Sequence, residues 1–272
     1  MFNFLPPQFT PFNSSENLKQ FLSPAGVMFF VMDRPEVHNA FDEKLIDEMT
    51  QALLECEENP EVKVLVLTGA GKNFSAGGDI NYMREIGQKN FEENKKDALA
   101  LAELMHTLNE FPKPTIARVN GSAFGGGVGL VCACDMAFGT PSTKICLSEV
   151  KIGMVPATIG PYVIKAIGPR NAHRLMLTAE IMQGQKAVNC GFLADVFDQE
   201  NFDKSVNKIA EKISNNGPEA LQITKAILHN LTYQPINEGV IDYTAEVIAQ
   251  VRSSEEGKEG LSAFLEKRKP KF

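Results

Sequence analysis

Two glycine-rich turns are the first feature of this sequence that could do chemistry. They are FSAGGDI at residues 74–80 and FGGGVGL at residues 124–130, and each is expected where a strand ends and a helix begins. Glycine lets backbone N–H groups approach a ligand closely, and the N-terminus of a following helix favours negative charge. One donor from each turn could converge on an oxygen that becomes negative during a reaction, which would form an oxyanion hole. Mobile surface loops are the alternative interpretation.

The turns do not match the common nucleotide-binding motifs. Neither is followed by the Gly-Lys-Ser/Thr of a phosphate loop, and neither contains the G-x-G-x-x-G of a dinucleotide site. The sequence therefore favours an anionic reaction intermediate over a nucleotide phosphate as the group that these turns bind.

Glu149 is the second candidate, because it is a carboxylate within the otherwise apolar segment KICLSEVKIGMVPA at residues 144–157. Buried carboxyls are rare unless they are paired or functional, so Glu149 is a candidate general acid or base. If the segment is an extended strand, Lys151 lies on the same side and a structural Glu–Lys pair is the alternative. Ser148 and Lys151 form S-x-x-K, but the Ser-Asp-Asn and Lys-Thr-Gly motifs that accompany a serine nucleophile do not occur.

Histidine and cysteine give no sign of a metal site. The four histidines lack metal-ligand spacing, and the five cysteines are odd in number and form no C-x-x-C pair, which also predicts no disulfide framework and a reducing environment. These residues are His38, His106, His173, His229, Cys56, Cys132, Cys134, Cys146 and Cys190.

Composition excludes several classes of protein. The chain has 272 residues, 43% of them hydrophobic, and 27 basic against 34 acidic residues give a net charge of −7. No basic block is combined with aromatic residues, so nucleic acid is not an expected partner. The longest uncharged stretch, residues 119–134, is broken by glycines and is too short to span a membrane. The first residues lack the features of a targeting segment, so we expect a cytoplasmic protein with no membrane partner.

Hydrophobic patterning predicts an α/β fold in which strands alternate with helices. A helix that begins after Asp42 as its N-cap separates two short apolar strands, and the chain becomes almost entirely helical after residue 169. The expected strands are residues 26–32, 62–68, 115–119, 136–139, 144–147 and 193–197, and the expected early helices are residues 42–58 and 91–111.

In sequence and in order, these segments resemble the enoyl-CoA hydratase/isomerase (crotonase) superfamily. The resemblance is carried by FSAGGDI, NGSAFGGGVGLVCACD, SEVKIGMVPA and LTAEIMQGQKAVNCGFLADVF, with DRPEVHNAFD before them and FLEKRKPKF at the end. It covers nearly the whole chain and implies a crotonase-like spiral of β-β-α units with a helical C-terminal region. Residues 1–200 would form the spiral core and 201–272 a helical trimerisation or lid region, in one continuous domain. The family also implies a homotrimer or a dimer of trimers.

The resemblance assigns roles to the two turns. The thioester carbonyl of an acyl-CoA substrate would accept hydrogen bonds from the backbone N–H groups of Gly78 and Gly126. The family's contacts to coenzyme A around the first turn map onto Gly78, Asp79, Ile80 and Asn81. The resemblance also implies that Lys267, Arg268 or Lys269 contacts a phosphate of coenzyme A. Coenzyme A is then part of the substrate, and no separate cofactor or metal is expected.

This sequence departs from the family pattern at one catalytic position. Hydratases of the family usually carry two glutamates, of which the second maps to Glu149 and the first to Gly129. One carboxylate could still serve a syn hydration, an isomerisation that moves a proton between two carbons, or a decarboxylation. A non-catalytic acyl-CoA-binding protein is a further alternative. Tyr82 or Glu85 could replace the missing glutamate, unless both simply lie on a solvent-facing helix.

The subgroup resemblance concerns the substrate. GGGVGL followed by SEVKIGMVPATIGPYVIKAIG is similar to bacterial methylglutaconyl-CoA hydratases of leucine catabolism and to carboxygeranoyl-CoA hydratases. The absent side chain at Gly129 is expected to leave room for a substituent on the β-carbon. The resemblance therefore implies hydration of a branched thioester such as 3-methylglutaconyl-CoA.

Overall fold

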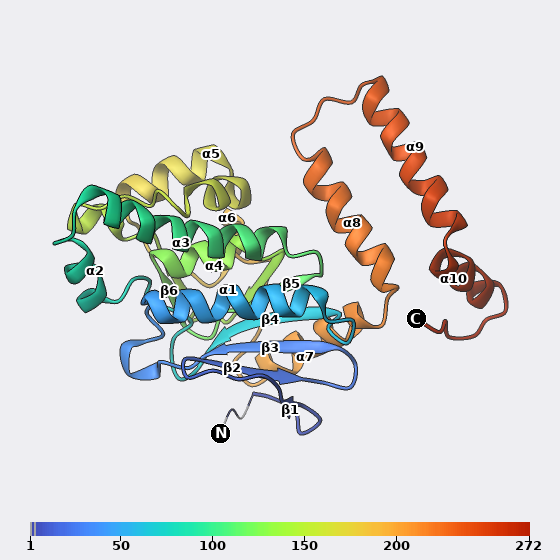
Figure 1. Ribbon diagram of the computed structural model, residues 1–272, viewed down its shortest axis with the longest axis horizontal. Coiled ribbons are helices and arrows are strands. Elements are labelled where there is room, and N and C mark those ends of the chain that lie inside the picture. The colour runs from blue at the N-terminus through green and yellow to red at the C-terminus, as the bar shows by residue number, and fades with distance from the viewer. Residues whose placement is uncertain (1, 3) are drawn as a thin grey trace.

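The computed structural model describes residues 2 and 4–272, which contain two β-sheets covered by helices (Figure 1). The larger sheet has the strand order β1-β2-β3-β4-β5-β7-β10, and the smaller has the order β6-β8-β9. The strands of the larger sheet are β1 (Thr10–Pro11), β2 (Leu18–Leu22), β3 (Val27–Met32), β4 (Val64–Gly69), β5 (Thr115–Arg118), β7 (Met136–Gly139) and β10 (Asp195–Val196). Those of the smaller sheet are β6 (Ser122–Phe124), β8 (Lys144–Cys146) and β9 (Met182–Gln183).

The centre of the larger sheet is parallel and buried on both faces. Strands β3, β4, β5, β7 and β10 run parallel, whereas β1 and β2 form an antiparallel edge. Every residue of β3 and β4 is buried, which explains why both read as continuous apolar runs rather than as alternating patterns. Parallel strands need crossover connections, and the helices of this chain supply them.

Helices cover both faces of this sheet. The face that carries Phe30 and Leu67 packs in one cluster with buried residues of α1 (Glu43–Glu58), α3 (Phe91–Glu110), α4 (Gly126–Ala133) and α5 (Gly160–Thr178). The opposite face, which carries Phe29 and Val66, packs against Phe202 of α7 (Phe202–Ser214). Of the two short helices, α2 (Ile80–Ile86) has no buried residue, whereas α6 (Gln185–Cys190) buries Ala187. Figure 1 shows α1, α3 and α5 on one side of the sheet and α7 on the other.

The last three helices form an arm that leaves the core (Figure 1). This C-terminal arm comprises α8 (Pro218–Leu231), α9 (Glu238–Ser253) and α10 (Glu255–Leu265). Its buried residues in the described chain are Lys225 on α8 and Ala263 on α10. Lys225 joins the arm to the core, because its Nζ atom donates to Asp135 at 2.8 Å. Much of the arm's apolar surface is consequently exposed.

The α/β fold expected from the sequence is confirmed. The strands expected at residues 26–32 and 62–68 and the helix after Asp42 are present, and the Asp42 side chain caps that helix by accepting from Leu45 N. Four strands, β1, β2, β6 and β9, were not expected. The helical C-terminal region begins with α7, which packs on the sheet, so the separate arm starts only at Pro218. Within the described residues, no helix is both long enough and apolar enough to cross a membrane.

Candidate active site

The two glycine-rich turns lie against each other in the structure. The first turn connects β4 to α2, the second connects β6 to α4, and Ser75 pairs with Ala123 in a parallel bridge between them. The Phe124 N–H donates to the Ser75 carbonyl at 2.9 Å. A Cβ atom on Gly77 would lie 2.8 Å from the Phe124 carbonyl oxygen and 3.2 Å from the Gly126 nitrogen. Glycine at position 77, which has a φ of +88°, is therefore required for the two turns to meet.

Gly78 has its N–H directed away from the chain segment with which it pairs. Gly78 and Phe41 form a parallel bridge in which Phe41 N–H donates to the Gly77 carbonyl at 2.7 Å and Asp79 N–H donates to the Phe41 carbonyl at 2.8 Å. In such a bridge, the residue whose two neighbours make the hydrogen bonds turns its own N–H to the opposite side. The Gly78 N–H is thus free of this pairing and available to a ligand.

Gly126 supplies the second donor. It is the first residue of α4, and an N–H at that position has no partner within its own helix. The preceding turn is fixed because Gly125 N–H donates to the Cys146 carbonyl at 3.0 Å. A Cβ atom on Gly126 would lie 2.7 Å from Cε2 of Phe41, so the same phenylalanine contacts both turns. The positive end of α4 adds to the attraction for an oxygen that carries negative charge.

Glu149 lies beside the second turn but not on a strand. It begins the short 3-10 helix η2 (Glu149–Ile152), so the extended segment expected from the sequence ends earlier, with β8. A Cβ atom on Gly125 would lie 3.5 Å from Glu149 Oε1. Among the ion pairs of the described residues, none joins Glu149 to the exposed Lys151. The structural Glu–Lys pair that the sequence left open is wrong, because the turn of η2 separates the two side chains.

Burial makes Glu149 suitable for proton transfer. Its Oε2 atom is buried and has no hydrogen-bond partner within the described structure. Burial without a nearby cation disfavours the ionised form and raises the pKa of Glu149 above its usual range. A carboxyl group with a raised pKa can both accept and release a proton at moderate pH, which is the property that general acid–base catalysis needs.

The structure corrects one expectation about Gly129. A Cβ atom at this position would lie 2.3 Å from Cγ2 of Ile159 and 3.1 Å from Cε of Met105. The space expected for a substituent on the substrate is therefore filled by these two side chains. Ile159 directly precedes α5, and it packs on the backbone of α4 where a glutamate side chain would otherwise begin.

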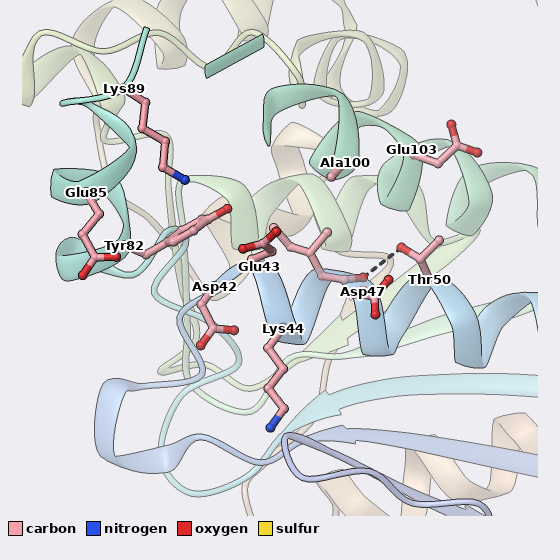
Figure 2. A pocket seen from close by; sticks show the side chains of 11 residues that line it. Asp42, Glu43, Lys44, Asp47, Thr50, Tyr82, Glu85, Lys89, Ala100 and Glu103 are labelled. Atoms are coloured by element: carbon pink, nitrogen blue, oxygen red, sulfur yellow. Dashed lines mark hydrogen bonds between the residues drawn. The ribbon is translucent and has the colours of Figure 1, made fainter. Parts of the chain in front are cut away.

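Tyr82 and Glu85 lie in a neighbouring cavity rather than beside Glu149. This cavity of about 740 Å³ lies between α1, α2 and α3, and neither turn glycine nor Glu149 lines it (Figure 2). Tyr82 donates its hydroxyl to Asp97 on α3, and burial together with that carboxylate raises the pKa of Tyr82. The structure thus gives neither residue the position of the missing glutamate.

The remaining residues expected at the site divide into two groups. Asp79 caps α2 by accepting from Asn81 N at 2.9 Å, and Ile80 beside it is 71% exposed, so this segment is open to a ligand. Lys269 instead lies near the end of the chain, which Figure 1 places at the opposite side of the molecule from α2. Arg268, beside it, pairs with Glu259 at 2.7 Å and with Glu266 at 2.6 Å. The basic tail therefore does not reach the turns of its own chain.

Sequence reasoning missed two residues that shape the site. Phe41 joins the turns, and Ile159 closes the space at Gly129. Phe41 directly follows the segment RPEVHNA, so its position in that motif was a signal that could have been used. No local pattern identifies Ile159, because its role depends on how the segment before α5 packs on α4.

Comparison with known proteins gives consistent results. The sequence model of a family described as enoyl-CoA hydratase/isomerase matches residues 23–272. The chain is 30% identical over 272 residues to "Enoyl-CoA hydratase, mitochondrial" from Pongo abelii, an alignment that covers 98% of this chain and 92% of that protein. It is also 30% identical over 260 residues to "Delta(3,5)-Delta(2,4)-dienoyl-CoA isomerase, peroxisomal" from Arabidopsis thaliana, which covers 91% of this chain and 93% of the relative.

Solved structures share the fold closely. The crystal structure of an enoyl-CoA hydratase from Shewanella pealeana superimposes with a TM-score of 0.90 at 44% sequence identity. The superposition covers 94% of this chain and 96% of that chain. Sequence and fold thus lead to the same group of proteins.

Proposed function

Because the chain belongs to the enoyl-CoA hydratase/isomerase family, we propose that it is an enoyl-CoA hydratase that adds water reversibly to an α,β-unsaturated acyl-CoA thioester. The observation that carries this proposal is the half-buried carboxylate of Glu149, whose Oε2 atom has no hydrogen-bond partner in the described structure, beside the turn that ends in the free N–H of Gly126. An acid–base group next to an oxyanion donor is the arrangement that conjugate addition of water requires.

In this proposal, Gly78 and Gly126 polarise the substrate. Their two N–H groups donate to the thioester carbonyl oxygen, which becomes negative as water adds at the β-carbon and an enolate forms. Removing one such donor typically lowers a rate by about 10²–10³-fold. Gly78, Asp79, Ile80 and Asn81 lie where the coenzyme A portion passes the first turn. Coenzyme A is part of the substrate, and no separate cofactor is proposed.

Glu149 moves both protons in the proposed mechanism. Its ionised carboxylate accepts a proton from water while the hydroxide oxygen bonds to the β-carbon. The same carboxyl group then returns that proton to the α-carbon on the same face, so the product is the substrate plus one water. No second carboxylate is needed, which agrees with Gly129 being enclosed by Ile159.

A branched substrate such as 3-methylglutaconyl-CoA is the finer part of the proposal. It is supported by the sequence resemblance of the segment around Glu149. Free space at Gly129 does not support it, because Ile159 occupies that space. A role in leucine breakdown follows from the same resemblance, and both this role and a cytoplasmic location remain predictions.

A second candidate function is a double-bond isomerase. It is favoured by the single carboxylate, since moving one proton between two carbons of the acyl chain needs one acid–base group. The relative from Arabidopsis thaliana named as a dienoyl-CoA isomerase is as similar to this chain as the named mitochondrial hydratase is. The side chain that fills the space at Gly129, Ile159, is apolar, which suits a reaction that proceeds without water.

The C-terminal arm supports assembly into a homotrimer or a dimer of trimers. Several of its apolar side chains are at least 60% exposed, among them Leu228, Ile241 and Phe264. Exposed apolar surface of this kind marks a protein interface. In such an assembly, Lys269 would reach a CoA phosphate at the active site of another subunit, since it lies far from that of its own chain.

One mass-spectrometric experiment separates these functions. The protein is incubated separately with crotonyl-CoA, 3-methylglutaconyl-CoA and a 3-enoyl-CoA. A mass gain of one water, fastest with the branched thioester, supports the proposal in full. A shifted double bond without a mass gain supports the isomerase, and binding without any conversion supports a non-catalytic acyl-CoA-binding protein.

A further inference from the structure

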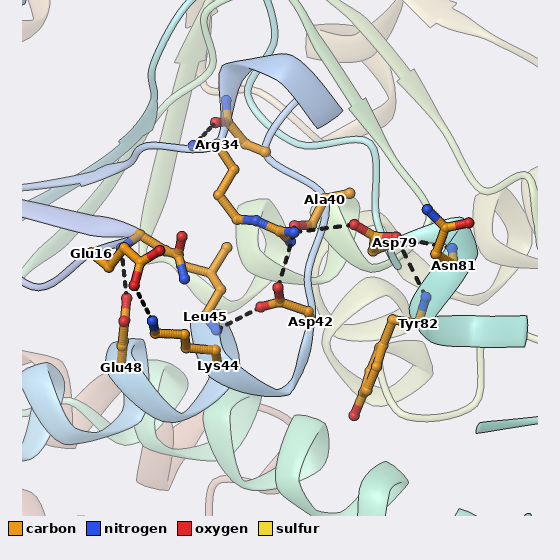
Figure 3. A network of polar contacts seen from close by, with 12 residues as sticks. Glu16, Arg34, Ala40, Asp42, Lys44, Leu45, Glu48, Asp79, Asn81 and Tyr82 are labelled. Atoms are coloured by element: carbon orange, nitrogen blue, oxygen red, sulfur yellow. Dashed lines mark hydrogen bonds and ion pairs between the residues drawn. The ribbon is translucent and has the colours of Figure 1, made fainter. Parts of the chain in front are cut away.

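Arg34 lies between the N-termini of α1 and α2, where it pairs with two carboxylates at once (Figure 3). Its Nη2 atom is 2.9 Å from Oδ2 of Asp42 and 3.2 Å from Oδ2 of Asp79. Its Nη1 atom donates to the Ala40 carbonyl at 2.7 Å. The Arg34 side chain is only 15% exposed, so these pairs are screened less by water and salt than pairs on the surface.

Each carboxylate uses its other oxygen to cap a helix. Oδ1 of Asp42 accepts from the Leu45 N–H of α1 at 2.8 Å, and Oδ1 of Asp79 accepts from the Asn81 N–H of α2 at 2.9 Å. Arg34 thus connects the two capping residues through the oxygens that the helices leave free. The guanidinium group suits this task, because it is planar and offers several donors in a fixed geometry.

The two carboxylates directly follow the two residues of the bridge that holds the first turn. Asp42 follows Phe41, Asp79 follows Gly78, and Phe41 and Gly78 pair with each other. Arg34 therefore holds both strands of this bridge at the same end. The direction of the Gly78 N–H depends on that bridge, because the pairing turns this N–H away from Phe41.

We propose that Arg34 is a positioning residue that holds the Gly78 N–H in the direction needed to polarise a thioester carbonyl. This inference rests on the proposed function, in which Gly78 donates to the substrate. Arg34 acts through Asp42 and Asp79 and needs no contact with the substrate. Without the guanidinium, the two carboxylates repel each other, Asp79 moves away from Asp42, and the bridge between Phe41 and Gly78 loosens.

The first test is steady-state kinetics on Arg34→Met and Arg34→Lys. We expect Arg34→Met to lower kcat by about 10- to 100-fold, less than the loss of a donor outright, with KM changed by less than about threefold. The kcat of Arg34→Lys should lie between those of Arg34→Met and the wild type, because an ammonium group keeps the positive charge but not the planar arrangement of several donors. Arg174→Met is the matched control, since it removes an exposed guanidinium of α5 that pairs with Glu180 just beyond the end of that helix.

A rescue variant separates positioning from general damage to the fold. Asp42→Asn keeps an oxygen that can cap α1 but removes one of the two negative charges. We expect the double variant Arg34→Met/Asp42→Asn to recover part of the kcat that Arg34→Met loses. If Arg34→Met does not fold, as judged by circular dichroism, Arg34→Lys and the double variant carry the comparison.

A spectroscopic measurement tests the inference without turnover. Difference infrared spectra of bound butyryl-CoA, labelled with ¹³C at the thioester carbonyl, report how strongly the oxyanion donors polarise that bond. We expect a smaller red shift in Arg34→Met than in the wild type and an unchanged shift in Arg174→Met. If the wild type shows the red shift but converts no unsaturated thioester, the proposed function fails while the inference holds. A folded Arg34→Met with wild-type kcat and wild-type red shift overturns the inference, as does a wild type that binds butyryl-CoA without any shift.

Discussion

The Cγ2 atom of Ile159 lies 2.3 Å from the position that a Cβ atom on Gly129 would occupy. Real Cβ atoms do not approach another carbon so closely, so position 129 accepts no side chain while Ile159 keeps its place. The absence of a first catalytic glutamate is therefore part of how α4 and the start of α5 pack.

Introducing a glutamate at position 129 should not produce a more active hydratase. We expect Gly129→Glu to lower the free energy of unfolding by at least the 1–3 kcal/mol typical of an overpacked core, because the side chain displaces Ile159 and Met105. Hydratase activity should fall and not rise. The double variant Gly129→Glu/Ile159→Ala should regain part of the stability, as measured by thermal unfolding. A stable Gly129→Glu enzyme with faster hydration would contradict this picture of the packing.

Phe41 should influence catalysis more than its contribution to stability explains. We expect Phe41→Leu to lower kcat by at least tenfold, since Phe41 pairs with Gly78 and its ring packs on Gly126. The matched control is Phe202→Leu, another fully buried phenylalanine on the opposite face of the sheet. Both variants should lose about 1 kcal/mol of stability, a common cost for a core substitution. Equal losses of kcat in the two variants would argue against a special role for Phe41.

Stability should depend on pH through Glu149. Burial raises the pKa of Glu149 above its ordinary value of 4.5. Between the unfolded and the folded pKa, the folded protein binds more protons than the unfolded chain, so its free energy of unfolding falls as pH rises through that window. Glu149→Gln should therefore be more stable than the wild type at pH 8, and the gain should disappear at pH 4. Thermal unfolding at both pH values tests this, with the exposed Glu200→Gln as the control for the loss of one charge. A Glu149→Gln protein that is less stable than the wild type at pH 8 would contradict the assigned cause of the shift.

The C-terminal arm should contribute to subunit contacts. Phe264 on α10 is 80% exposed within one chain, so a charge at this position should not affect the folding of the chain itself. We expect the wild type to sediment as an assembly of several chains and Phe264→Glu to shift it toward smaller species, whereas Phe264→Leu should not. Analytical ultracentrifugation gives the mass of each species. An unchanged assembly in Phe264→Glu would exclude this part of α10 from the interface.

Much of the fold could be predicted because local patterns agree with the tertiary structure. Strands β3 and β4 are short apolar runs buried on both faces, and Asp42 marks the start of α1 by the chemistry of its side chain. The two glycine turns and Glu149 could also be selected, since a run of glycines and a carboxylate in an apolar segment are both visible in the sequence.

The remaining features depend on packing between distant segments. The sequence left open an extended chain at Glu149, but β8 ends three residues earlier and a 3-10 helix begins at Glu149. Ile159 fills the space at Gly129 only because α5 starts against α4. Arg34 has many acidic residues nearby in sequence, and only the bridge between Phe41 and Gly78 selects Asp42 and Asp79 as its partners.

The most direct test of the account compares Glu149→Gln with the wild type on an unsaturated acyl-CoA. Glutamine keeps the size of the side chain but cannot exchange a proton in the reaction, so we expect kcat to fall by about 10²–10⁴-fold. Binding of butyryl-CoA, measured by calorimetry, should remain within about threefold of the wild type, because the donors at Gly78 and Gly126 are backbone groups. A Glu149→Gln protein that binds butyryl-CoA and turns over the unsaturated thioester at the wild-type rate would contradict the central claim that Glu149 is the acid–base group.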